Sequence, residues 1–240
     1  MEVKPIEQKD VIQVPDDESE EKIELDEDTE TIELREAKGP AIKFYSKSTE
    51  KDDLKMNDKT WAKYISTYAP FNFRDRNNPT ITYENMEAAI GAEKYKVATN
   101  KPDLGQTLFA TFGTIHQKYE EARSGVTDSE ELKKLTEEEG SAYRTEQSEK
   151  TMGKHKATFN KEKWDNVKEA IIADYARQRF ERDEKFRKII QKAGELEVKL
   201  VYYTDTKGSN ELGGIIKDGA IIGENLYGRA LMELVGLGYE

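Results

Sequence analysis

Negative charge is concentrated at one end of this 240-residue chain, and this limits how much of the chain can fold around a core. Residues 1–38 contain fifteen Asp or Glu against five Lys or Arg, which is −10 of the formal net charge of −11. Few apolar residues among so many charges bury too little surface to offset the entropy lost on ordering the backbone. We therefore predict that residues 1–40 form a disordered acidic arm and that residues 41–240 form a single domain.

The remaining composition argues against several classes of protein. The chain has no Cys and only two His, His116 and His155, so disulfides, a cysteine nucleophile and an ordinary zinc site are excluded. No apolar run approaches the roughly 18 residues of a membrane span, and no basic and then apolar signal sequence begins the chain. The near-neutral domain offers no basic surface for a nucleic-acid backbone. We expect a cytoplasmic protein without membrane association, metal or other cofactor.

Short apolar runs and turn residues mark the first elements of the domain. The run Ala41–Ser46 is typical of a strand, and the charged residues 47–59 are typical of a loop. We expect the aromatic segment Trp61–Phe73 to wrap against the core without a long regular element. Turn residues at Asn77–Thr80 precede a helix-compatible run, Tyr83–Tyr95. A further amphipathic helix is predicted by spacings of three and four between Leu104, Leu108, Phe109, Phe112 and Ile115.

The second half of the domain is predicted to be mainly helical. Charge dominates residues 117–150, which we interpret as a solvent-facing helical insertion with a start near Thr127 and a stop at Gly140. The clearest helix follows, with a bend or break near Arg182-Asp183 and Gly194 as its C-terminal cap. Its apolar face contains Trp164, Val167, Ile171 and Tyr175, continued by Phe186, Ile189, Ile190 and Ala193.

The C-terminal segment adds a strand, a loop and a last helix. Residues 198–203 are predicted to form the strand, and the Gly-rich residues 208–223 the loop. The last helix would bury Leu226, Ala230, Leu231 and Leu234. The predicted fold class is therefore mainly α, an α+β fold with a small β element.

Two residues on the run Tyr83–Tyr95 could carry chemistry. Glu87 and Lys94 are seven positions apart, which leaves them only ~20° apart around a helix axis and about two turns apart along it. A carboxylate can stabilise a cationic sugar or orient water, and a lysine can bind phosphate or attack a sugar aldehyde. The same pattern is also typical of a solvated helix face, because Glu and Lys are common helix formers.

Five segments resemble, in the same order, the motifs of the NADAR (YbiA-like) family. They are Ile42–Ser46; Ile65–Pro70, similar to a Ser-Asn-Phe block; Glu87–Tyr95, similar to Glu-His-Tyr-Phe-Gln-Ala-Gln-Lys-Phe; Met152–Phe180, similar to the Met-Gly-Arg to Trp to Lys-Phe segment; and Gly223–Glu233, similar to Gly-Lys-Asn-x-Leu-Gly-x-x-Leu-Met-Glu. The resemblance implies one helical domain that hydrolyses N-glycosidic bonds of ribose-containing metabolites or ADP-ribose adducts.

The resemblance also implies roles for particular residues. Glu87 stands at the family's essential glutamate and Lys94 at its lysine. Trp164 stands at its tryptophan, where stacking on a base and simple core packing are both open. Asn225 stands at the asparagine of the closing motif, where it would contact ribose hydroxyls or cap the last helix. Lower-ranked candidates for lining the pocket or holding phosphate are Tyr45, Ser66 and Lys154.

The sequence departs from the family pattern ahead of the last motif. Leu212-Gly213 replaces a Trp-Gly pair. The family's Asp before that pair is then displaced to Asp205, substituted near Ser209 or Asn210, or missing. Thr67 also replaces the Asn of the Ser-Asn-Phe block.

The leading hypothesis is an N-glycosidase acting on a riboflavin-pathway intermediate or an ADP-ribosylated base, including one in a nucleic acid. The alternative is a catalytically degenerate module that binds ADP-ribose or a nucleotide. In this alternative, the acidic arm and the charged insertion dock a protein partner. A third hypothesis is that the arm is an acidic mimic that competes for a basic partner.

Overall fold

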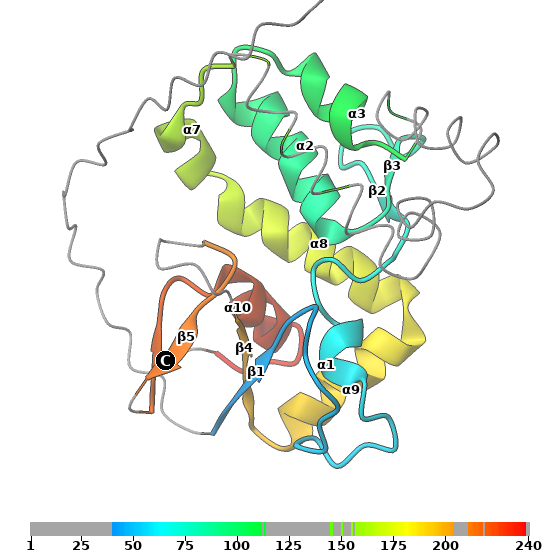
Figure 1. Cartoon of the computed structure of the whole chain (residues 1–240), viewed down its shortest axis with the longest axis vertical. Helices are drawn as coiled ribbons and strands as arrows, with labels where there is room; N and C mark the ends of the chain where they lie inside the picture. Colours follow the sequence, from blue (N-terminus) through cyan, green and yellow to red (C-terminus); the bar gives the residue numbers. More distant parts are fainter. Residues whose placement is uncertain are drawn as a thin grey trace, which may run out of the picture. The chain divides into compact units, whose positions relative to one another are not determined.

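The computed structural model describes residues 40–111, 113, 145, 150, 155, 157–203, 211–217 and 219–238. The predictions for the acidic arm, and for the start and stop of the insertion, lie outside these residues. The elements in chain order are β1 (Ala41–Phe44), α1 (Trp61–Tyr64), β2 (Phe73–Arg74), β3 (Thr82–Tyr83), α2 (Met86–Ala98), α3 (Asp103–Phe109), α7 (Lys161–Asp165), α8 (Lys168–Arg182), α9 (Glu184–Glu195), β4 (Lys199–Tyr202), β5 (Ile215–Lys217), β6 (Ala220–Ile222) and α10 (Leu226–Glu233) (Figure 1).

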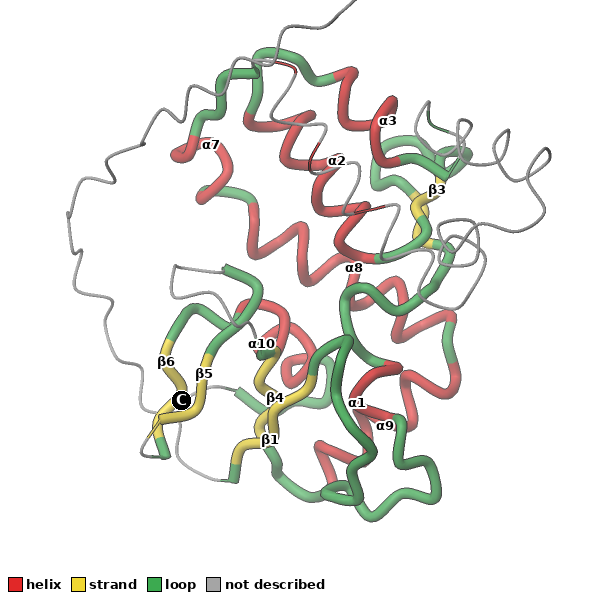
Figure 2. Tube along the Cα trace, in the orientation of Figure 1, coloured by secondary structure: helices red, strands yellow, loops and turns green. Residues whose placement is uncertain are grey.

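The strands of the described residues form three separate pairs, which confirms an α+β fold with a small β content (Figure 2). β1 and β4 are parallel, with a register that runs from Ala41 opposite Lys199 to Phe44 opposite Tyr202. β2 pairs with β3 and β5 with β6, both antiparallel. The parallel pair joins residues about 160 positions apart, because a parallel partner must be reached through a crossover connection.

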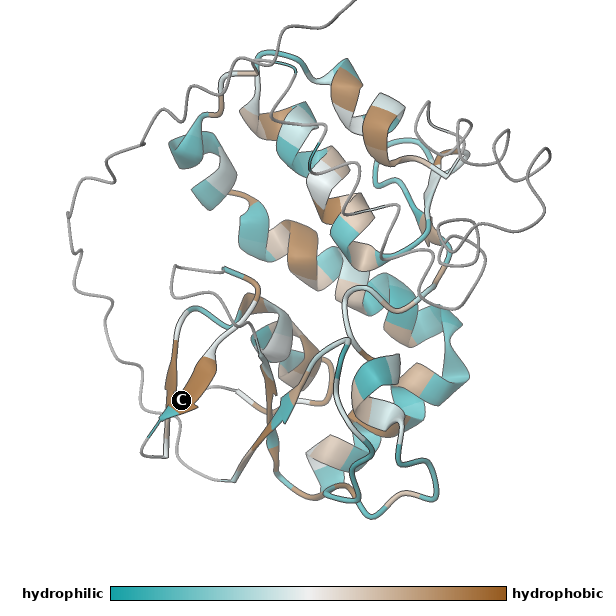
Figure 3. Ribbon diagram, viewed as in Figure 1, coloured by the Kyte–Doolittle hydropathy of each residue, from teal (hydrophilic) through white to brown (hydrophobic). Residues whose placement is uncertain are grey.

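The helices pack around α2, which contacts α3, α7 and α8. Small residues allow α2 and α3 to approach closely: a Cβ on Gly105 would lie 2.4 Å from the Ala92 carbonyl oxygen, and one on Gly91 2.7 Å from the Phe109 ring. Hydrophobic positions alternate with hydrophilic ones along α8 (Figure 3), as expected for a helix with one buried face. No helix in the described ranges has the length and apolar character needed to cross a membrane.

Two predicted helices have different boundaries in the structure. α2 begins at Met86 and not at Tyr83, because Tyr83 belongs to β3 and the Asn85 side chain caps the helix by accepting from the Ala88 amide at 2.8 Å. α3 ends at Phe109, well short of residue 115, because Ala110 adopts an extended backbone. The aromatic segment 61–73 matches its prediction, because its one helix is the four-residue α1, which buries Trp61, and its last residue, Phe73, begins the short strand β2.

The long predicted helix is divided into α7, α8 and α9. The break near Arg182-Asp183 is confirmed, because Asp183 is extended and its side chain caps α9 by accepting from the Phe186 amide at 3.0 Å. A second break after Asp165 was not predicted.

Gly194 is not the C-terminal cap of this segment, so that prediction is wrong. The left-handed residue is Glu197, with φ 51°. Its amide bonds to the Gly194 carbonyl at 2.9 Å, and the Val198 amide bonds to the Ala193 carbonyl at 3.0 Å, which is the Schellman arrangement. Gly194 instead leaves room for the side chain of Val235, because a Cβ added to Gly194 would lie 3.0 Å from the Cβ of Val235.

Two further predictions need correction. Residues 215–222, predicted as loop, form the β5–β6 hairpin, and Gly219 in its turn has φ 82°. The Asp218-Gly219 pair in the sequence is typical of a two-residue hairpin turn. The insertion was predicted to face solvent, and the structure describes two of its residues: Lys150 is exposed, whereas Thr145 is buried and its hydroxyl accepts from Asn85 Nδ2 at 2.8 Å.

Candidate functional site

Glu87 lies in the first turn of α2 and is held by two hydroxyl groups from other parts of the chain. Thr67 Oγ1 donates to Glu87 Oε1 at 2.6 Å, and the Tyr202 hydroxyl lies 2.5 Å from Thr67 Oγ1 and 3.5 Å from Glu87 Oε1. The Thr67 carbonyl also accepts from the Met86 amide at 2.9 Å, which fixes this loop against the start of α2. Thr67 and Tyr202 therefore orient one oxygen of the carboxylate.

The surroundings of Glu87 favour its protonated form. Burial raises the pKa of the Glu87 carboxyl, and it outweighs the hydrogen bond from Thr67 and the positive charge of Lys94, which both lower that pKa. Glu87 nevertheless remains partly exposed. Burial, together with the nearby Glu87 charge, also raises the pKa of Tyr202 well above its ordinary value, so this hydroxyl stays protonated. A partly accessible carboxyl with a raised pKa is suited to proton transfer.

Lys94 belongs to a second group of contacts, with Trp164 on α7 and Glu211 in the segment before β5. Trp164 Nε1 donates to Glu211 Oε2 at 2.6 Å. Lys94 Nζ lies 5.2 Å from the centroid of the indole and 3.9 Å from the same Glu211 oxygen. The indole and the carboxylate thus hold the ammonium group on the side of α2 that also carries Glu87.

Trp164 is fully buried, with 0% of its surface exposed. Its ring nitrogen is occupied by Glu211 and Lys94 lies over the ring. In this arrangement it packs in the core and positions Lys94, and it offers no open face to a base.

Asn225 holds the strand β4. Its Oδ1 accepts from the Tyr202 amide at 3.0 Å and its Nδ2 donates to the Leu200 carbonyl at 3.1 Å, while 1% of its surface is exposed. It precedes α10 with a left-handed backbone, φ 45°, and makes no side-chain cap to that helix. The capping alternative is therefore wrong, and the side-chain amide holds β4 through both its oxygen and its nitrogen.

The remaining predicted residues are more distant from this arrangement or not described. The Tyr45 ring packs on Tyr203, with centroids 5.4 Å apart. Ser66 is buried beside Thr67, and its carbonyl accepts from Arg179 at 3.4 Å. Lys154 and Asp205 lie outside the described residues.

Three residues of the arrangement were not predicted as site residues: Thr67, Tyr202 and Glu211. Thr67 was noted only as a departure from a motif. Glu211 directly precedes Leu212-Gly213, so an acid at this place could have been proposed from the sequence. Tyr202 gave no signal, because an aromatic residue inside a strand is ordinary core composition.

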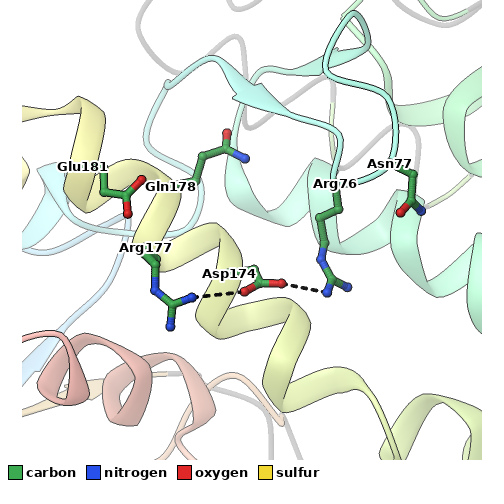
Figure 4. A pocket seen from close by; sticks show the side chains of 6 residues that line it. All are labelled: Arg76, Asn77, Asp174, Arg177, Gln178 and Glu181. Atoms are coloured by element: carbon green, nitrogen blue, oxygen red, sulfur yellow. Dashed lines mark ion pairs between the residues drawn. The ribbon is translucent and has the colours of Figure 1, made fainter.

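Within the described ranges, no group of three or more His, Asp or Glu could hold a metal ion. An open hollow of about 390 Å³ lies elsewhere, between α8 and the loop after β2 (Figure 4), and none of the predicted site residues lines it. Its Asp174 is paired with Arg76 at 2.7 Å and with Arg177 at 3.5 Å. The other residues that line it are Asn77, Gln178 and Glu181.

No protein-family model, curated protein or solved structure matches the chain.

Proposed function

We propose that this protein is an N-glycoside hydrolase that acts on a ribose-phosphate or ADP-ribose unit attached to a heterocyclic base. The observation that carries the proposal is the partly exposed Glu87 carboxyl, oriented by Thr67 and within the electrostatic influence of Lys94. The ordered resemblance of five segments to NADAR motifs supports the same reaction class.

Glu87 is assigned the central chemical role. Thr67 holds Oε1, so Oε2 serves the substrate: ionised, it stabilises the oxocarbenium-like sugar carbon or takes a proton from the attacking water. The raised pKa brings the carboxyl closer to neutrality, where a group exchanges protons most effectively. The leaving base carries away the bonding electron pair, water supplies the hydroxyl group to the sugar, and the proton that Glu87 takes from water passes to the base.

Lys94 is assigned to the phosphate of the substrate or, after ring opening, to the sugar C1 as a transient imine. Trp164 and Glu211 hold its ammonium group in place. A substrate phosphate that draws Lys94 away from the indole uncovers one ring face, on which a base can then stack.

The test compares wild type with Glu87→Gln on ribosylamino pyrimidines of the riboflavin pathway and on ADP-ribosylated guanine. Base release by the variant is expected to fall by ~10²-fold or more, the usual contribution of a general acid or base. Glu184→Gln, which alters an exposed glutamate on α9, is the matched control and should retain full turnover. Equal turnover by Glu87→Gln and wild type on the true substrate removes the role assigned to Glu87.

A second candidate function is ADP-ribose or nucleotide binding without catalysis. It is favoured by Leu212, a buried residue that stands where the Trp-Gly pair of the family has its tryptophan. Saturable binding of ADP-ribose by wild type, with no base released from any of these substrates over long incubation, would support this candidate over the hydrolase.

A further inference from the structure

A second cluster of titratable side chains lies on the same helix, α2, and takes no part in the proposed reaction. The Lys96 ammonium contacts Asp75 Oδ2 and lies 3.1 Å from Glu93 Oε1. Asp75 and Glu93 are 3% and 1% exposed, and 13% of the Lys96 side chain is exposed. One ammonium is therefore shared between two buried carboxylates. Burying such charges is unfavourable unless they are well paired.

The two carboxylates have different surroundings. Asp75 Oδ1 accepts from the backbone amides of Asn77 at 2.9 Å and Asn78 at 3.0 Å. Asp75 Oδ2 accepts from the Tyr83 hydroxyl at 2.5 Å as well as from Lys96. One oxygen thus has two N–H donors of the kind that stabilise an oxyanion, and the other has a proton donor beside it.

Glu93 is placed to receive a proton from the amine. Its Oε1 accepts both from Lys96 at 3.1 Å and from the Tyr175 hydroxyl at 3.1 Å. The fully buried Tyr83 contacts Asp75 and Lys96, and the fully buried Tyr175 contacts Glu93, so these two rings limit the access of bulk water to the cluster. An amide that forms here is shielded from hydrolysis.

We propose that Lys96 and Asp75 condense to an intramolecular isopeptide bond, with Glu93 as the proton carrier. The ammonium gives one proton to Glu93 and becomes a neutral amine, whose lone pair attacks Asp75 Cγ. The charge that develops on Oδ1 is held by the amides of Asn77 and Asn78. The C–Oδ2 bond breaks, and Oδ2 leaves as water with two protons of the original ammonium, one of them returned by Glu93.

The atoms balance without any external reagent. An ammonium and a carboxylate become one amide and one water, and Glu93 ends in the protonation state in which it began. The reaction replaces a buried ion pair by a neutral group, whose N–H still donates to Glu93. Glu93 itself is not the expected acceptor of the bond, because the two backbone amides serve Asp75.

The test is the intact mass of the purified full chain under denaturing conditions, after N-terminal processing is accounted for. Wild type should be lighter than its sequence by the mass of one water. Lys96→Arg should lose this difference. Lys188→Arg is the matched control: it alters an exposed lysine in an ion pair with Glu184 at 2.6 Å, and it should keep the water loss.

Peptide mapping locates the bond. Trypsin should not cleave after Lys96, and a branched peptide should join Asp75-Arg76 to the peptide that contains Tyr95-Lys96-Val97. Glu93→Gln should prevent or strongly slow the bond, with circular dichroism as the check of folding. An unmodified wild-type mass, free Lys96 after digestion, or Lys96 linked to any residue other than Asp75 overturns the proposal. A folded Glu93→Gln variant that forms the bond as fully as wild type overturns the role of Glu93. This inference does not depend on the proposed hydrolase activity.

Discussion

Replacement of Asn225 tests whether its amide group stabilises the fold. Asn225→Ala removes two buried hydrogen bonds, one from the Tyr202 amide and one to the Leu200 carbonyl. A buried amide left unsatisfied costs about 1–3 kcal/mol and the lost hydrogen bond to the Leu200 carbonyl about 0.5–1.5 kcal/mol, so the two together cost about 1.5–4.5 kcal/mol. Alanine in the left-handed backbone of this position adds about 1 kcal/mol. This is a large part of the ~5–15 kcal/mol that stabilises a typical domain.

Three variants separate the two contributions. Asn225→Gly loses both hydrogen bonds but tolerates the positive φ, so it should be about 1 kcal/mol more stable than Asn225→Ala. Asn166→Ala is the matched control, because Asn166 is exposed, and it should change the free energy of unfolding by no more than about 0.5 kcal/mol.

The assay is urea denaturation without ligand, followed by the fluorescence of the two buried tryptophans, Trp61 and Trp164. If Asn225→Ala unfolds at the same urea concentration as the Asn166 control, the amide does not hold β4. A role for Asn225 in ligand binding would then regain support.

Three further variants have expected effects on stability. Glu87→Gln should raise the melting temperature at neutral pH, and this gain should vanish at acidic pH. Folding raises the pKa of Glu87, so the contribution of this carboxyl to stability is complete below its ordinary pKa and is lost as the pH rises through the raised value. A gain that grows towards low pH would contradict this sign. Gly91→Ala should lower the free energy of unfolding by about 1–3 kcal/mol, because the new methyl group meets the Phe109 ring; an unchanged urea midpoint would show that the ring moves away freely. Asp58→Asn should cost less than ~1 kcal/mol, because the ion pair with Lys185 is largely solvent-exposed. The hydrogen bond from Lys185, followed in size by the one from Thr60, lowers the pKa of Asp58 to about 2. The stabilisation that Asp58 gives the fold is therefore present above pH 3.8 and is lost as the pH falls towards 2. Melting temperatures of wild type and Asp58→Asn, measured across this pH range, check the prediction.

The parts of the fold that follow from local sequence were predicted well. β1, β4, the break at Asp183 and α10 each depend on apolar spacing or on a capping side chain within a few residues. The end of α3 and the role of Gly194 were mistaken, because the contacts that decide them come from distant segments. Gly194 is small to make room for Val235, which no local pattern near Gly194 can indicate.

The same distinction applies to the candidate site. The helical spacing of Glu87 and Lys94 placed them on one face of α2, because both belong to one element. Their partners could not be derived in this way, since Thr67, Tyr202 and Glu211 reach them through tertiary packing. Whether Trp164 stacks on a ligand or packs in the core also depended on what covers its ring, which the sequence does not contain.

The parallel pairing of β1 with β4 has a consequence for synthesis of the protein. Ribosomes synthesise the chain from its N-terminus at ~5–20 residues per second, so β1 and α2 are made many seconds before β4, the strand that pairs with β1. During that interval Glu87 lacks Tyr202, and the edge of β1 is unpaired. The candidate site is therefore complete only after β4 and Asn225 have been synthesised, and a nascent chain stalled before Asn225 should be a substrate for chaperones and proteases.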